Sequence, residues 1–140
     1  MVAAFMGHLE IVKYLIEIGA DINTRNNVGW TAVMVAAYEG HLETVKYLTE
    51  AGADIHKRNN RGWTAVMGAA RNKHYKVCQY LIHSGTHLSS AKEYLDDLLA
   101  WAAKEGDMTM CLKLVRVGAN FNKEISPGVT PMSLCLQNLV

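Results

Sequence analysis

The sequence repeats itself every 33 residues, and this repetition constrains the fold more than any other feature of the chain. Residues 7–39 and 40–72 share 24 of their 33 positions. The same register continues toward both ends, because glycines recur at this interval, at Gly19, Gly52, Gly85 and Gly118. A period of this size is typical of solenoids, in which each repeat buries its apolar face only against its neighbours. We therefore expect a stack of similar repeats.

The register predicts a single domain over residues 1–140 with three full and two partial repeats. The full repeats are expected at 26–58, 59–91 and 92–124, and the partial ones at 1–25 and 125–140. Residues 1–4 match residues 34–37, so the apolar start of the chain is interpreted as part of a repeat helix and not as a signal peptide. On this interpretation the array is truncated at both ends.

Each repeat is expected to contain two short helices. Thr31 or Thr64 is placed to cap the first helix of its repeat with its hydroxyl, and Gly52 can end the second helix with a positive φ. Leu42, Val45 and Leu48 recur at a spacing of three and form one apolar stripe. The pattern predicts an all-α fold of stacked antiparallel helix pairs, joined by polar loops.

Three motifs carry a resemblance to a known family. They are Asn59-x-x-Gly62-x-Thr64-Ala65-Val66-Met67, Gly40-His41-Leu42-Glu43 and Gly52-Ala53-Asp54. With these motifs the chain resembles the ankyrin repeat family over essentially its whole length. The resemblance implies an ankyrin-repeat solenoid with short β-hairpin fingers projecting from the helix pairs. It also implies a non-catalytic, protein-binding scaffold.

The chain departs from the family pattern at several positions. The family motif Thr-Pro-Leu-His becomes Thr-Ala-Val-Met at 31–34 and 64–67, which removes the histidine that hydrogen-bonds near the start of the first helix. In the third full repeat Asp97 takes the threonine position, where we expect it to cap. Lys73 replaces a linking glycine, so strain is expected there. Trp101 is predicted to pack into the space left by Gly68, one repeat earlier.

No pattern in the sequence indicates catalysis, a metal site or a cofactor. His8, His41 and His74 recur at the repeat interval. However, stacked helices lie about 8–10 Å apart, whereas zinc holds its nitrogen ligands at about 2.0–2.1 Å. We interpret these histidines as residues that are satisfied locally. Phosphate loops, nucleophile elbows and CxxC motifs are not found in the sequence, and we expect no enzyme.

The composition disfavours nucleic acid and membrane as partners and predicts a reducing compartment. The net charge of +1 disfavours nucleic acid, and the absence of an apolar run of about 18 residues disfavours the membrane. The three cysteines, Cys78, Cys111 and Cys135, are odd in number and widely spaced. They are interpreted as free thiols in a reducing compartment, which predicts an intracellular protein, cytoplasmic or nuclear.

The family resemblance implies that a protein partner lies along the fingers and the inner face of the first helices. Residue types common in binding hot spots then give these candidates by register: Asn27, Trp30, Tyr38, Asn60, Arg61, Trp63, Arg71 and Tyr94. The two fingertip tryptophans either contact the partner or pack against a neighbouring finger. Tyr38 and Arg71 are favoured because the two near-identical repeats differ there.

Two other observations leave alternatives open. Residues 55–92 carry seven basic and no acidic side chains, whereas residues 93–107 carry five acids and one lysine. This polarity would steer a partner of opposite polarity, or it reflects ordinary solvated faces. Apolar end faces, with Val2, Phe5, Leu134, Leu136 and Leu139, suit end-to-end self-association or a passive spacer in a longer ankyrin-repeat protein. Nucleic-acid binding through the basic residues 57–76 is the weakest alternative function. Separately, Asn23 resembles an asparagine that hydroxylases modify in this family.

Overall fold

The computed structural model describes residues 1–89 and 91–138 and contains two compact units, Met1–Thr86 and His87–Val140. The described residues form helices, with one isolated β-bridge between Ser126 and Val129. The predicted all-α class is therefore confirmed. The single-domain organisation stays a prediction.

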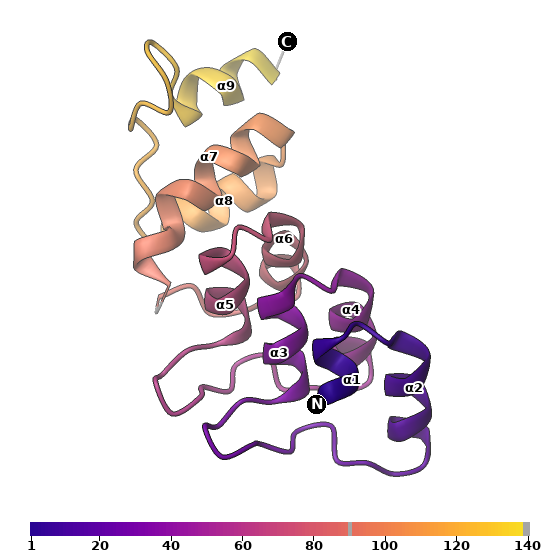
Figure 1. Cartoon of the computed structure of the whole chain (residues 1–140). Helices are drawn as coiled ribbons and strands as arrows, with labels where there is room; N and C mark the ends of the chain where they lie inside the picture. The colour runs from indigo at the N-terminus through magenta and orange to yellow at the C-terminus, as the bar shows by residue number, and fades with distance from the viewer. Residues whose placement is uncertain (90, 139–140) are drawn as a thin grey trace. The chain divides into compact units, whose positions relative to one another are not determined.

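The first unit consists of three helix pairs. The bounds are α1 Val2–Phe5, α2 Leu9–Glu17, α3 Ala32–Glu39, α4 Leu42–Glu50, α5 Ala65–Arg71 and α6 Tyr75–His83. Figure 1 shows α1, α3 and α5 side by side in one row, with α2, α4 and α6 in a second row. Long loops precede α3 and α5 and extend beyond the helix ends (Figure 1). The predicted stack of helix pairs is present in this unit.

The apolar stripes of α4 and α6 lie at the centre of the first unit. Val45 and Leu48 of α4 are fully buried, and so are Cys78 and Leu81 at the same positions of α6. Leu42, which begins the predicted stripe, is half-buried. Because equivalent positions face the neighbouring repeat, the 33-residue period in the sequence becomes a periodic core.

The expected threonine caps are not made. Thr31 and Thr64 precede α3 and α5 with extended backbones, but neither side chain forms a capping hydrogen bond. Both hydroxyls are buried and have no hydrogen-bond partner among the described residues. The prediction of a hydroxyl cap is therefore wrong. The positions three residues later hold Met34 and Met67, whose thioethers are weak acceptors and cannot donate as a histidine ring would.

The second unit contains a short 3₁₀ helix, η1 Lys92–Tyr94, and three α-helices, α7 Leu95–Glu105, α8 Met108–Arg116 and α9 Pro131–Asn138. Helix α7 packs against both α8 and α9. It begins directly after Tyr94, so Asp97 lies inside its first turn and does not cap it. This corrects the expectation for Asp97. Leucine replaces glycine at position 95, and a leucine favours the helix where a glycine would oppose it.

The sequence also predicts strain at Lys73 and a packing partner for Gly68. Lys73 has a φ of 60° and is the one non-glycine residue with positive φ in the described part of the chain, so the predicted strain is present. The predicted pairing of Trp101 with Gly68 joins residues of different units and stays a prediction. Within the first unit the ring of Tyr38 lies closest to Gly68, because a Cβ added there would be 3.4 Å from Tyr38 Cδ2.

All three cysteines are buried free thiols, as predicted. Cys111 of α8 and Cys135 of α9 bring their Sγ atoms to 3.9 Å from each other, a contact that their spacing in the sequence did not indicate. Burial raises the pKa of Cys78 and of Cys111 to about 12, and Cys135 adds to the effect at Cys111. These two thiols are therefore protonated at neutral pH and are poor nucleophiles.

Of the end-face residues, Leu136 is exposed and Leu134 is half-buried, whereas Leu139 lies outside the described residues. No helix within 1–89 or 91–138 has the length and apolar character needed to cross a membrane.

Candidate protein-binding surface

The two fingers of the first unit are closed in the same way, which explains why asparagine recurs at their base. Asn26 donates its backbone N–H to the Trp30 carbonyl at 3.0 Å, and Asn59 does the same to Trp63 at 2.9 Å. The Asn26 Oδ1 accepts from the Val28 and Trp30 N–H groups, and Asn59 Oδ1 accepts from Arg61 and Trp63. These bonds replace a longer β-hairpin ladder and hold each fingertip in one conformation.

Neighbouring fingers are joined directly to each other. Asn60 donates its backbone N–H to the Val28 carbonyl at 3.1 Å and its Nδ2 to the Asn27 carbonyl at 3.2 Å. Gly29 has a φ of 83°, and a Cβ there would lie 2.6 Å from Asn60 Oδ1. The candidates Asn27 and Asn60 therefore set the spacing between the fingers, with only part of their polar surface left for a partner.

Each fingertip tryptophan contacts the helix of its own repeat. The ring centroid of Trp30 lies 5.2 Å from that of Tyr38, at an interplanar angle of 88°. One repeat later, the guanidinium carbon of Arg71 lies 5.1 Å from the Trp63 ring centroid. Both tryptophans stay half-buried. The structure thus brings together four of the predicted residues in two equivalent pairs.

A groove of about 230 Å³ lies between the first finger and α3. It is lined by Phe5, Asn26, Val28, Trp30, Val35, Tyr38 and Glu39. The predicted residues Trp30 and Tyr38 form part of this lining. Phe5 and Val35 are not among the residues predicted from the sequence. The repeat register could have indicated Phe5, because it occupies the Tyr38 position one repeat earlier.

The two remaining predicted residues, Arg61 and Tyr94, lie in different units. Arg61 is exposed at the tip of the second finger, two residues before Trp63. Tyr94 lies in η1 of the second unit and is half-buried. Its membership of the same surface stays a prediction.

The recurring histidines are used for packing between repeats. His41 places Nε2 2.8 Å from the Phe5 carbonyl oxygen. A Cβ on Gly7 would come within 2.7 Å of the His41 ring, and one on Gly40 within 2.5 Å of the His74 ring. His41 is therefore satisfied by the preceding repeat and not at the start of its own helix, which corrects the local interpretation for this residue. No group of three or more metal-ligating side chains occurs among the described residues.

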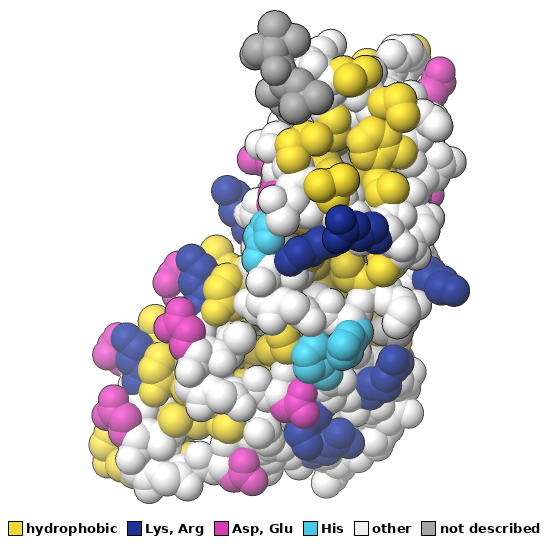
Figure 2. All heavy atoms as spheres, turned by 180° about the vertical axis from the view of Figure 1, so that it is seen from behind, with side chains coloured by type: hydrophobic (Ala, Val, Ile, Leu, Met, Phe, Trp, Pro, Cys, Tyr) yellow, Lys and Arg dark blue, Asp and Glu magenta, His cyan; other side chains and the backbone are white. Residues whose placement is uncertain are grey.

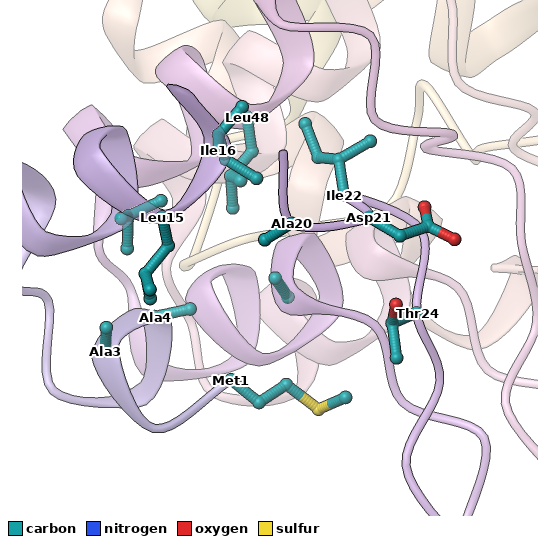
Figure 3. A pocket seen from close by; sticks show the side chains of 12 residues that line it. Met1, Ala3, Ala4, Leu15, Ile16, Ala20, Asp21, Ile22, Thr24 and Leu48 are labelled. Atoms are coloured by element: carbon teal, nitrogen blue, oxygen red, sulfur yellow. The ribbon is translucent and has the colours of Figure 1, made fainter. Parts of the chain in front are cut away.

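A second pocket, of about 250 Å³, lies between α1, α2 and the following loop (Figure 3). Its lining is mainly apolar and includes Leu15, Ile16 and Leu48. The Asp21 carboxylate points away from these side chains in Figure 3 and accepts a hydrogen bond from the Asn23 N–H at 2.9 Å. Asp21 and Thr24 are the polar residues of the lining, so the pocket offers few polar groups to orient a ligand.

The lysines on α2 and α4 form ion pairs with glutamates of the same helix. Lys13 lies 3.6 Å from Glu10, and Lys46 lies 3.7 Å from Glu43. Each lysine also lies near a tyrosine of the next repeat, with Lys46 Nζ at 5.9 Å from the Tyr80 ring centroid. Basic and acidic side chains lie next to one another on the face seen in Figure 2. Such exposed pairs add little stability, but they leave few unpaired charges on these helices.

The stacked helix pairs and linked fingers define the class of protein as an α-solenoid. A family model described as ankyrin repeats (3 copies) matches residues 1–92, more than half of the chain, and the chain belongs to the ankyrin repeat family. No curated protein matched the chain. Ankyrin repeats are generally protein–protein interaction modules and are generally not enzymes.

Proposed function

We propose that this chain is a non-catalytic binding module whose partner protein lies along the inner surface of the first unit. We define the inner surface as Asn27, Trp30, Tyr38, Asn60, Arg61, Trp63 and Arg71. The observation that carries the proposal is the groove of about 230 Å³, which is walled by Trp30 and Tyr38 and is open to solvent beside a rigid finger. Fixed aromatic walls keep the entropy lost on binding small.

The chemistry of the inner surface supports this proposal. Tryptophan, tyrosine and arginine, the types enriched in binding hot spots, are paired there as Trp30–Tyr38 and Trp63–Arg71. The hydrogen bonds between fingers hold both pairs in a fixed relation. We propose further that Tyr94 extends the surface, that both units form one domain, and that the protein acts as a scaffold in a reducing, intracellular compartment.

A pull-down with matched variants tests the proposed surface. The bait is the full chain, beside a Tyr38→Ala/Arg71→Ala variant and a Lys46→Ala/Tyr47→Ala control on α4. Circular dichroism first shows that all three are folded. We expect a captured protein to disappear with the inner-surface variant and to remain with the control. Equal capture by all three chains would contradict the proposed surface.

A passive spacer role is the second candidate, and one observation favours it. Ile11 and Tyr14 on α2 are 51% and 61% exposed, which leaves an apolar helix face open to further stacking. A spacer needs that face and no inner-surface partner. The same pull-down separates the two functions, because a spacer would lose nothing when Tyr38 and Arg71 are replaced.

A further inference from the structure

The two complete repeats of the first unit place different chemistry beside an identical tryptophan. Next to Trp30 stand Tyr38 and Glu39, and at the same positions next to Trp63 stand Arg71 and Asn72. The finger backbone that positions the two tryptophans is the same in both repeats. The two sites can therefore be compared directly, with the surrounding scaffold held constant.

In the second of these repeats the Arg71 guanidinium already covers the tryptophan ring. The Arg71 guanidinium carbon lies 5.1 Å from the Trp63 ring centroid, within the range of about 6 Å for an attractive cation–π contact. The neighbouring Asn72 is neutral, and its Nδ2 donates to the Tyr38 carbonyl at 2.8 Å. This repeat supplies its own basic side chain, which shows that a guanidinium fits against a tryptophan at this position.

In the preceding repeat the cation is missing and an acid is present. Tyr38 meets Trp30 edge to face, and the groove beside them is bounded by a third ring, Phe5, and by the half-buried side chain of Glu39. Among the described residues, no ion pair or hydrogen bond is formed by the Glu39 carboxylate. The groove therefore combines aromatic walls with an unpaired negative charge.

We propose, building on the proposed function, that this groove receives a basic side chain of the partner protein, with arginine the best fit. A guanidinium is planar, stacks on aromatic rings and can accept a carboxylate as a bidentate partner. The walls Phe5, Trp30 and Tyr38 offer the rings, and Glu39 offers the carboxylate. The Arg71 at the next repeat repels a second cation, so the basic residue is directed to the first repeat only.

The indole N–H signals of Trp30 and Trp63 in a ¹⁵N-correlated NMR spectrum test the proposal with the full chain. They are assigned with Trp30→Phe and Trp63→Phe variants. The probe is N-acetyl-arginine amide, and N-acetyl-citrulline amide at matched ionic strength is its neutral counterpart. We expect the Trp30 signal to shift with the arginine probe and the Trp63 signal to stay in place, because Arg71 already fills that site.

Two variants sharpen this test. Glu39→Gln should weaken the arginine probe's binding about threefold, the range of a partly exposed ion pair. Arg71→Ala should make the Trp63 signal respond as well, because its site is then vacated. A silent Trp30 signal, or equal shifts with both probes, would overturn the proposal and indicate an apolar groove. The proposed function would survive that outcome, because the pull-down depends on Tyr38 and Arg71 and not on this probe.

Discussion

Lys73 occupies a link between paired helices where the other repeats have glycine. Its φ is 60°, while Gly7 and Gly40 at the equivalent positions have φ values of 71° and 79°. We predict that Lys73→Gly raises the free energy of unfolding by about 1 kcal/mol, because a side chain in the left-handed region is strained and glycine is not. Urea denaturation followed by circular dichroism measures the change.

The matched control for this prediction is Gly40→Ala, one repeat earlier. It places a Cβ in the same backbone conformation, 2.5 Å from the His74 ring. We expect this variant to lower the free energy of unfolding, because strain and a clash add together. A Lys73→Gly variant that is less stable than the natural chain would show that the link is not strained.

At the scale of single residues, the sequence could predict backbone strain but not buried hydroxyl groups without hydrogen-bond partners. The repeat register alone identified Lys73, since three other glycines marked the position. The buried, unpaired hydroxyls of Thr31 and Thr64 needed the structure. Whether a hydroxyl finds a partner depends on distances between side chains that a sequence pattern does not contain.

Helix α5 contains a glycine that its packing does not require. A Cβ on Gly68 would make ordinary contacts at 3.4–3.7 Å with Tyr38. We predict that Gly68→Ala raises the free energy of unfolding by about 0.5–1 kcal/mol, because alanine loses less backbone freedom in a helix. Thermal melting of the variant checks the direction.

A larger side chain at the same position should have the opposite effect. Gly68→Leu adds bulk against the Tyr38 ring and is expected to destabilise the protein strongly by overpacking. If its melting temperature equals that of the natural chain, the space beside α5 is larger than the contacts indicate, and the proposed complementarity between Gly68 and a bulky neighbour is wrong.

At the scale of the whole molecule, α2 presents the kind of surface that the next repeat buries. Ile11 is 51% exposed, whereas Thr44 at the same position of α4 is 2% exposed because α2 covers it. Exposed apolar side chains that align with a buried stacking face favour association. We predict that the chain self-associates reversibly and that Ile11→Lys reduces this association, as measured by sedimentation equilibrium.

A lysine placed elsewhere on an exposed apolar side chain controls for charge. Leu112 on α8 is 54% exposed, and Leu112→Lys should leave the self-association unchanged. A chain that stays monomeric at all concentrations tested would exclude association through α2 and would weaken the spacer alternative with it.

The sequence by itself determined the features that follow from periodicity. A 33-residue period places equivalent side chains against each other in every repeat, so the helix pairs, the buried stripe of Val45 and Leu48 and the strained Lys73 link could all be predicted. The tertiary structure decided the contacts that break the period. Cys111 contacts Cys135, and Arg71 covers the Trp63 ring where Tyr38 contacts Trp30 in the preceding repeat. These contacts depend on side-chain direction in space, which a repeat register does not encode.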